Sequence, residues 1–337
     1  MKNREFPKIS IVIPTFNEEA NIVRALESIY KQEYPTKCLE VIIVDDYSTD
    51  NTLALAKKFP VKILKNGSYD GEVGKMIGLQ RATGDFFYYF DADMELIGTN
   101  WFQSMLLPFS KEKDIAGAFT RNYARRSAPS LERYFAMDPI HRDPVFEFFS
   151  PSVESTIIAD NKDYKLCKYT LTKIPPAARC LYRMTLIKEI TKGEEKFMEL
   201  DILTILVKKG MNTFAYVTHP GKYHHHAKSL LQLIRKRRRN VNKVYLPTIS
   251  KREYTWFNLK DSRDVMKILL LIFYAHTLVF STARGLYKSL KWKDIAGMWE
   301  PVVTLVITDT IIFSFLVNIK GVHFIMRSYL GKLSNRS

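Results

Sequence analysis

The first 93 residues alternate short apolar runs with segments of helical periodicity, and this alternation most constrains the fold. Strands that alternate with helices predict a parallel sheet covered by helices on both faces. In such sheets, ligands bind at the carboxyl ends of the strands. We therefore look for a site in the polar clusters that follow the first, second and fourth runs. The expected strands are residues 9–14, 39–44, 61–64 and 86–90, and the expected helices are 17–30, 52–59 and 74–82.

The fourth expected strand leads directly into Asp91-Ala92-Asp93. Carboxylate oxygens are the ligands that Mg²⁺ and Mn²⁺ prefer, and both ions also bind phosphate oxygens. An isolated Asp-x-Asp pattern is common in loops. Here the same α/β pattern contains a second acidic strand end, Asp45-Asp46, which favours a divalent-metal site at this edge of the sheet.

The positive charge of the chain is concentrated in its C-terminal third. Residues 228–337 contain 20 Lys and Arg but only 6 Asp and Glu, whereas residues 1–227 contain 31 and 29. A basic segment favours an anionic partner, either nucleic acid or an acidic membrane surface. Three cysteines, an odd number without CxxC spacing, argue against a disulfide scaffold or a cysteine zinc site and fit a reducing compartment. The N-terminal apolar run is too short for a signal peptide.

Two apolar stretches, residues 265–282 and 301–319, end the chain. We expect each to be a helix, and 18 helical residues span about 27 Å, close to the thickness of a bilayer core. Asp309 weakens the second candidate unless the first stretch shelters it. The connection between them contains Arg284 and Lys288, which opposes full crossing and leaves insertion into one leaflet open. Buried helices of a soluble protein are the alternative.

Three motifs carry a family resemblance: Ile11-Val-Ile-Pro-Thr-Phe-Asn-Glu18, Val44-Asp-Asp-Tyr-Ser-Thr-Asp50 and Phe90-Asp-Ala-Asp93. In this order and spacing they resemble the inverting family 2 glycosyltransferases of the GT-A fold. The resemblance is strong over about residues 8–100 and weaker to about 240. It implies an α/β fold with a mostly parallel, Rossmann-like sheet flanked by helices. To this we add a C-terminal, membrane-associated helical hairpin.

The expected domains follow from this combination. A GT-A catalytic domain would span residues 1–230, with a nucleotide-sugar half to about residue 100 and an acceptor half from about 101 to 230. A basic juxtamembrane linker would span residues 231–263, and the apolar hairpin with its basic tail residues 264–337.

The resemblance also implies a binding site for a nucleotide-diphospho-sugar linked to UDP or GDP. Asp46 would accept a hydrogen bond from the base or ribose, and Lys75 would approach the diphosphate. Asp45 and Asp50 could instead cap the helix that begins near residue 52. The residues that it assigns to the nucleotide sugar are Pro14, Thr15, Phe16, Glu18, Asp45, Asp46, Lys75, Asp91 and Ala92.

The metal in this family neutralises the leaving diphosphate, and the second acid of the Asp-x-Asp motif binds it most directly. The resemblance therefore assigns Mn²⁺ or Mg²⁺ to Asp93 and Asp91. A late histidine completes the metal site in several enzymes of the GT-A fold, and His224 or His226 could do so here. Three consecutive histidines point in different directions, so at most two could bind one ion.

The catalytic base is expected near the start of a helix over residues 198–209. Counting back from Gly210 places Glu199 at the usual base position and Asp201 at the second acid. Acids also occur at helix N-termini without a catalytic role. If the acceptor is a polyprenyl phosphate, a cationic pocket matters more than a base, and Arg179, Arg235 and Arg238 could supply it. The arginine run could equally contact anionic lipid.

These observations predict an inverting transferase that moves one sugar to a lipid-linked or membrane-presented acceptor. The expected location is a membrane, with the catalytic domain on the cytoplasmic face. A sugar-1-phosphate nucleotidyltransferase is the alternative enzyme, although residues 14–18 lack the Gly-rich signature expected there. A nucleic-acid-binding protein is a third reading, which the balanced charge of residues 1–227 opposes.

Overall fold

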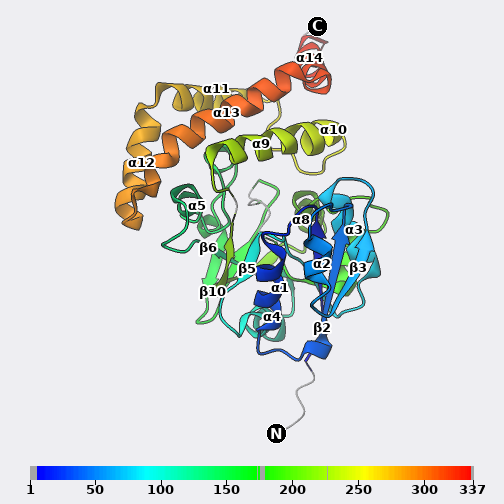
Figure 1. Cartoon of the computed structure of the whole chain (residues 1–337). Helices are drawn as coiled ribbons and strands as arrows, with labels where there is room; N and C mark the ends of the chain where they lie inside the picture. The colour runs from blue at the N-terminus through cyan, green and yellow to red at the C-terminus, as the bar shows by residue number, and fades with distance from the viewer. Residues whose placement is uncertain (1–5, 173, 175–178, 226, 335–337) are drawn as a thin grey trace. The chain divides into compact units, whose positions relative to one another are not determined.

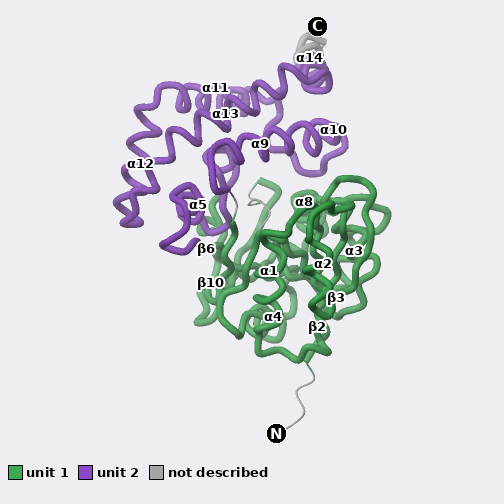
Figure 2. Tube along the Cα trace, in the orientation of Figure 1, with its two compact units in different colours: residues 1–123, 152–225 green, residues 124–151, 226–337 purple. Residues whose placement is uncertain are grey.

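The computed structural model describes residues 6–172, 174, 179–225 and 227–334. The chain divides into two compact units, shown in different colours in Figure 2. Unit 1 comprises Met1–Tyr123 and Ser152–His225, and unit 2 comprises Ala124–Pro151 and His226–Ser337. Unit 1 contains strands and helices, whereas the described part of unit 2 is helical (Figure 1).

A mostly parallel sheet forms the N-terminal part of unit 1, as the alternating pattern predicted. Its strand order is β3-β2-β1-β4-β9, in which β3, β2, β1 and β4 are parallel and β9 is antiparallel to β4. Thr15 lies opposite Asp45 in the register, so the first two strands end together. The strands are β1 (Ile9–Thr15), β2 (Leu39–Asp45), β3 (Val61–Lys65), β4 (Phe86–Tyr89) and β9 (Tyr182–Arg183).

A second sheet has the order β5-β10-β8-β7, and β6 pairs in parallel with β10. β10 runs from Thr213 through Gly221 to His224, with an irregular register to β6 between Val217 and Lys222. The strands are β5 (Met94–Leu96), β6 (Ile115–Tyr123), β7 (Ile157–Asp160), β8 (Lys165–Lys168) and β10 (Thr213–His224).

Helices cover both faces of the first sheet. The α1 side chains Leu26 and Ile29 belong to the same core as Ile11 of β1. On the opposite face α3 approaches β1 closely, because a Cβ atom on Gly78 would lie only 2.2 Å from Cγ1 of Val12. The helices of unit 1 are α1 (Ile22–Tyr30), α2 (Thr52–Ala56), α3 (Gly71–Arg81), α4 (Trp101–Lys111), α7 (Met184–Ile190) and α8 (Glu199–Lys208), with 3-10 turns at Thr36–Cys38 and Glu154–Thr156.

Unit 2 collects the C-terminal helices and two short helices from the middle of the chain. Its elements are α5 (Ser130–Phe135), α6 (Pro144–Phe149), α9 (Leu230–Asn240), a π-helical turn (Val241–Tyr245), α10 (Leu246–Thr248), α11 (Ser262–Thr277), α12 (Val279–Trp292), a 3-10 segment (Ile295–Trp299), α13 (Glu300–Val317) and α14 (Ile319–Ser334).

The expected single helix over residues 265–282 is wrong. α11 ends at Thr277, and α12 begins at Val279 after a bend of 78° at Leu278, whose φ is +56°. After the bend, α12 forms ion pairs with other helices of unit 2. The Lys288 ammonium lies 2.9 Å from Glu147 of α6 and 2.7 Å from the fully buried Glu300 of α13.

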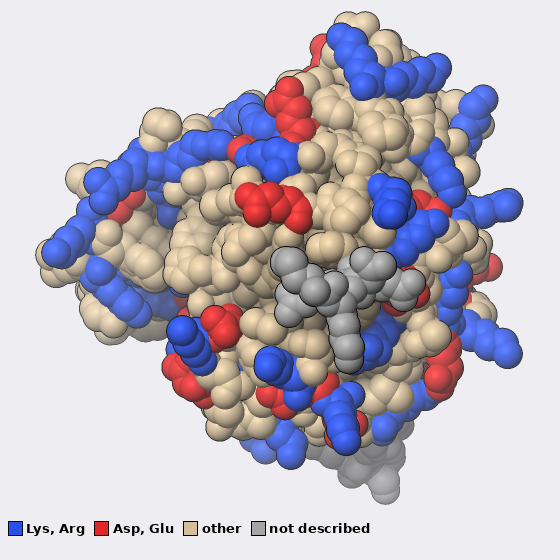
Figure 3. Space-filling model, turned by 90° about the horizontal axis from the view of Figure 1, so that it is seen from below, with Lys and Arg blue, Asp and Glu red and all other residues tan. Residues whose placement is uncertain are grey.

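One helical stretch of the described residues, Ile295–Val317, is long and apolar enough to cross a membrane. Its Asp309 lies 3.2 Å from Nε2 of His276 in α11, so the first apolar segment does supply a partner for this acid. Figure 3 shows Lys and Arg side chains scattered among Asp and Glu on the face in view, rather than gathered into one basic patch.

Candidate active site

The acids at the end of β2 shape the loops around the edge of the first sheet. The buried Asp45 carboxylate accepts hydrogen bonds from Oγ1 of Thr15 (3.1 Å) and from the backbone N–H (2.9 Å) and hydroxyl (2.6 Å) of Ser48. Asp50 accepts from the backbone N–H of Thr52, at the start of α2 (3.0 Å). The Asp50 contact lies at the start of α2, where the sequence alternative placed it, whereas Asp45 binds Thr15 and Ser48 and does not cap that helix.

Asp46 binds a different loop. Its carboxylate accepts from the backbone N–H of Tyr69 and from the side-chain amide of Asn66, both at 2.9 Å. Burial raises the pKa of Asp46, with Asp45 and Asp70 acting in the same direction, against the opposing Tyr69 hydrogen bond. Asp46 therefore positions Tyr69.

Two exposed aromatic rings stand at this edge. Phe16 follows β1 and is 48% exposed, and Tyr69 precedes α3 and is 61% exposed. Their ring centroids are 5.9 Å apart in an edge-to-face arrangement. Pro14, the second-last residue of β1, is half-buried. The Glu18 carboxylate accepts from the side-chain amide of Asn21 (2.8 Å) at the start of α1. The pair of rings offers flat apolar surface of the kind a base can contact.

Asp91, Asp93 and His224 form a cluster that fits a divalent cation. One ligand atom from each lies within 4.8 Å of the others. The β-ladder builds this cluster, because His224 lies opposite Met94 in the antiparallel pairing of β10 with β5, directly beside Asp93. Nε2 of His224 is 3.5 Å from Oδ1 of Asp93. Two carboxylates and one imidazole are a suitable donor set for Mn²⁺ or Mg²⁺ completed by water and phosphate oxygens.

The remaining residues of these two motifs point elsewhere. Nε2 of His225 lies 3.9 Å from Glu95, away from the Asp93 carboxylate that His224 faces. β10 ends at His224, and the two histidine side chains therefore leave the end of the strand toward different acids. Ala92 is buried between the two acids of the motif. His226 lies outside the described residues.

Two cations accompany the acidic cluster. The Arg179 guanidinium contacts Oδ2 of Asp91 through both Nε (2.8 Å) and Nη2 (2.7 Å). The Lys75 ammonium lies 2.8 Å from Glu72 and 4.4 Å from the centroid of the Tyr89 ring. Burial disfavours both charges, but nearby carboxylates, Asp91 among them, raise the pKa of Arg179 and of Lys75, so both stay cationic.

Glu199, the first residue of α8, is buried and accepts four hydrogen bonds. Tyr89 (2.6 Å) and the backbone N–H of Arg179 (3.1 Å) donate to Oε2, and the backbone N–H of Cys180 (2.9 Å) and Tyr182 (3.2 Å) donate to Oε1. A carboxylate offers about four lone-pair positions, and all of them are used here. Glu199 therefore ties the segment containing Arg179 to the end of β4.

A model of the family "Glycosyl transferase family 2" matches residues 10–190, which is more than half of the chain and includes both strand-end motifs. The chain belongs to glycosyltransferase family 2. This identity agrees with the parallel sheet and with the acids at its carboxyl edge, and it establishes the chain as a transferase of the GT-A type.

Curated relatives match this glycosyltransferase over about a quarter of its length. Poly(ribitol-phosphate) β-N-acetylglucosaminyltransferase TarS of Staphylococcus aureus is 36% identical over 92 residues, 26% of this chain and 16% of TarS. Dolichyl N-acetyl-α-D-glucosaminyl phosphate 3-β-D-2,3-diacetamido-2,3-dideoxy-β-D-glucuronosyltransferase of Methanococcus voltae is 40% identical over 91 residues, 25% of this chain and 28% of the relative.

A GalNAc(5)-diNAcBac-PP-undecaprenol β-1,3-glucosyltransferase of Campylobacter jejuni is 36% identical over 98 residues, 27% of this chain and 31% of the relative. The matches to all three relatives thus span less than a third of the relatives' own lengths.

The residues expected to contact an acceptor or phosphate belong to both units of this glycosyltransferase. Arg179 lies in unit 1 against Asp91, while Arg235 and Arg238 are exposed on α9 of unit 2. Arg237, between them in the sequence, is buried and forms an ion pair with Asp143. The arginine run is therefore not one solvated face.

Sequence reasoning missed Lys222 and Tyr69. Lys222 is fully buried in β10, its ammonium contacts the carbonyl oxygen of Thr120 (3.4 Å), and burial together with Arg179 lowers its pKa to about 7. Lys222 and His224 are two residues apart in the same strand, β10, and this spacing was a usable sign that Lys222 lies near the metal-binding cluster. Tyr69 carried no such signal, because its place depends on the distant Asp46.

Proposed function

We propose that this glycosyltransferase moves one sugar from a nucleoside-diphospho-sugar to a lipid-linked acceptor at a membrane, with inversion at the anomeric carbon. The observation that carries the donor half is the grouping of Asp91, Asp93 and His224 beside two cations at the edge of the sheet. Anionic diphosphate is the ligand that this combination of metal donors and cations suits best.

The donor would bind with its base near Phe16 and Tyr69 and its diphosphate near Asp93. Thr15, Asp45 and Asp46 would set the shape of the loops around the base, since their side chains hold those loops together. A divalent cation held by Asp91, Asp93 and His224 would supply charge neutralisation to the leaving diphosphate. Lys75 and Arg179 would contribute positive charge to the same group.

Sugar transfer would be a single displacement. The acceptor oxygen forms a bond to the anomeric carbon as the bond from that carbon to the diphosphate oxygen breaks, and the electron pair leaves with the diphosphate. Asp201, in the first turn of α8, would take the proton of a hydroxyl acceptor. Glu199 would act as a positioning residue, because its four hydrogen bonds are made to the protein itself.

The membrane half of the proposal rests on unit 2. Large apolar side chains are exposed along its helices, among them Leu269 and Phe273 of α11, Phe280 of α12 and Phe313 of α13. Exposed apolar surface on this scale marks membrane or protein interaction sites. The basic residues of α9, including Arg235 and Arg238, favour an anionic, cytoplasmic face. The relatives from M. voltae and C. jejuni are named for dolichyl-linked and undecaprenol-linked acceptors.

A transfer assay tests this proposal. The purified full chain is incubated with Mn²⁺, a panel of UDP- and GDP-sugars, and a polyprenyl phosphate in detergent. We expect sugar in the lipid phase and an equal amount of nucleoside diphosphate. Asp93→Asn should abolish both products, and Asp160→Asn, at an exposed aspartate of unit 1, should leave them unchanged. Formation of pyrophosphate from a nucleoside triphosphate and a sugar 1-phosphate, without sugar in the lipid phase, would instead indicate a nucleotidyltransferase and would refute the proposal.

A further inference from the structure

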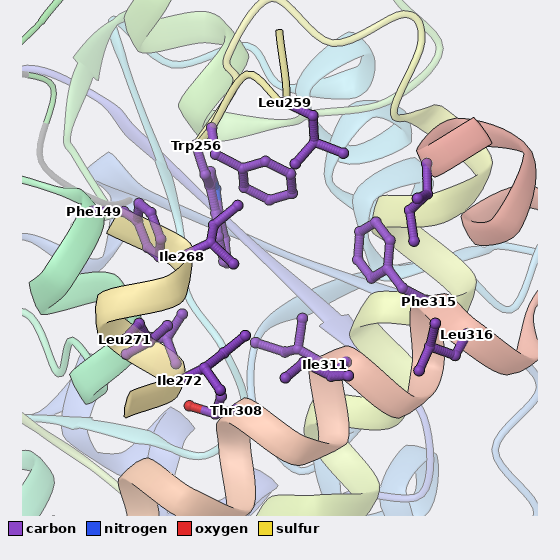
Figure 4. A pocket seen from close by; sticks show the side chains of 14 residues that line it. Phe149, Trp256, Leu259, Ile268, Leu271, Ile272, Thr308, Ile311, Phe315 and Leu316 are labelled. Carbon is purple, nitrogen blue, oxygen red and sulfur yellow. The ribbon is translucent and has the colours of Figure 1, made fainter. Parts of the chain in front are cut away.

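Unit 2 contains an apolar cavity of about 170 Å³. Side chains from α6, α11, α13, α14 and the segment 256–259 line it. In Figure 4, Trp256, Leu271, Ile311 and Phe315 surround a common space, and the one hydroxyl among the labelled side chains is that of Thr308. The cavity is partly open to the surface, so a ligand could enter it.

The size and lining of the cavity define the chemistry of a ligand. An apolar cavity of roughly 150 Å³ stays dry and binds benzene. The cavity of unit 2 therefore has room for about six or seven carbon atoms. A polar group would lose its hydration there without gaining hydrogen-bond partners, so the cavity suits a hydrocarbon segment.

A smaller cavity adjoins the first, and together they form an apolar path with a polar group at one end. It has a volume of about 80 Å³ and shares Trp256, Phe257, Ile311 and Phe315 with the larger one. Arg252 also lines it, with the guanidinium 5.3 Å from the centroid of the Tyr245 ring. An apolar path that ends at a guanidinium is complementary to a hydrocarbon chain attached to an anionic head group.

We propose that these adjoining cavities bind the first isoprene units of a polyprenyl phosphate, with its phosphate at Arg252. The choice of an isoprenoid over an acyl chain rests on the function proposed above, whereas the requirement for a hydrocarbon chain with an anionic end rests on the cavities alone. Only the segment nearest the phosphate fits, and the rest of the chain would extend along the exposed apolar side chains of unit 2.

Photo-crosslinking tests the site directly. The full chain in detergent is labelled with a photoreactive farnesyl phosphate, and the modified residues are mapped by mass spectrometry. We expect labels at Phe257, Ile311 and Phe315, and at least tenfold suppression by excess farnesyl phosphate but not by a diacyl phosphatidic acid. Farnesol, which lacks the phosphate, should compete about tenfold less well, and Arg252→Gln should remove this difference.

A matched pair of variants checks the cavity itself. Ile311→Trp fills the space shared by both cavities and should reduce labelling at least tenfold, while Ile319→Trp, at an exposed isoleucine of unit 2, should not. The labelling map of the unmodified chain keeps the test valid if Ile311→Trp fails to fold.

Labelling spread over exposed residues such as Leu269 and Phe273 without competition would overturn the site, and equal competition by phosphatidic acid would overturn the isoprenoid. Release of nucleoside diphosphate from the donor, measured in parallel, separates this inference from the proposed function. Donor turnover without cavity labelling contradicts the inference alone, and cavity labelling without donor turnover contradicts the proposed function alone.

Discussion

Replacing Glu199 by glutamine exchanges one acceptor oxygen of a buried carboxylate for an NH₂ group. Each carboxylate oxygen accepts one backbone N–H and one tyrosine hydroxyl: Arg179 N–H and Tyr89 at Oε2, Cys180 N–H and Tyr182 at Oε1. A tyrosine hydroxyl can turn to accept a hydrogen bond from the new NH₂, but a backbone N–H cannot. Either orientation of the glutamine amide therefore leaves one backbone N–H facing another donor.

This geometry sets the expected cost. A buried N–H without an acceptor costs about 1–3 kcal/mol, and the remaining hydrogen bonds lose the strengthening that a charged acceptor gives. We therefore expect Glu199→Gln to lower the free energy of unfolding by about 3 kcal/mol. For a folded unit of this size, that corresponds to a fall in the melting temperature of roughly 6–12 °C.

The control is Asp201→Asn, which removes an acid from the same helical turn. Its carboxylate is only half-buried, so Asp201→Asn should lower the melting temperature by less than Glu199→Gln does. In the transfer assay with a hydroxyl acceptor, Asp201→Asn should lower kcat about a hundredfold or more. Equal melting temperatures for the two variants would refute the assignment of Glu199 as a positioning residue.

Two further predictions concern the first sheet. Burial alone would raise the pKa of the Glu40 carboxyl, but hydrogen bonds from Lys62, Ser10 and Thr83 lower it from the usual 4.5 to about 2. The ionised carboxylate therefore stabilises the fold above pH 4.5, and this stabilisation is lost as the pH falls from about 4.5 to 2. Glu40→Gln should cost about 3 kcal/mol at pH 7 and little at pH 2, measured by urea unfolding at each pH. Gly78→Ala should lower the free energy of unfolding by about 3 kcal/mol, because the new Cβ would collide with Val12. Gly71→Ala should not lower it, because the new Cβ has open space around it. Equal unfolding midpoints for these two variants would contradict the packing of α3 on β1.

The sequence predicted the first sheet because its information is local. Apolar runs such as residues 39–44 give the strand, and the acids that follow give the edge where Asp45 and Asp91 lie. The pairing of His224 with Asp93 was predicted only as a possibility, because it depends on the register between β5 and β10. β10 continues through residues 219–221 although its register to β6 is irregular there.

Long-range contacts account for what could not be predicted. Glu199 accepts from Tyr89, which is 110 residues away, so its structural role is invisible in the helix pattern that surrounds it. Similarly, the break at Leu278 lies inside an apolar stretch without Gly or Pro, and the acids that pair with α12 come from α6 and α13. No sequence pattern indicated that Glu147 and Glu300 would form ion pairs with α12.

Mn²⁺ binding in the presence of a nucleoside diphosphate tests the central claim most directly. Electron paramagnetic resonance of free Mn²⁺, with UDP and GDP tried separately, measures binding without requiring an acceptor. The account predicts one tightly bound Mn²⁺ per chain with the matching diphosphate, weakened at least a hundredfold by Asp93→Asn, which removes a ligand of the Asp91, Asp93 and His224 cluster. Unchanged Mn²⁺ affinity in Asp93→Asn would contradict it.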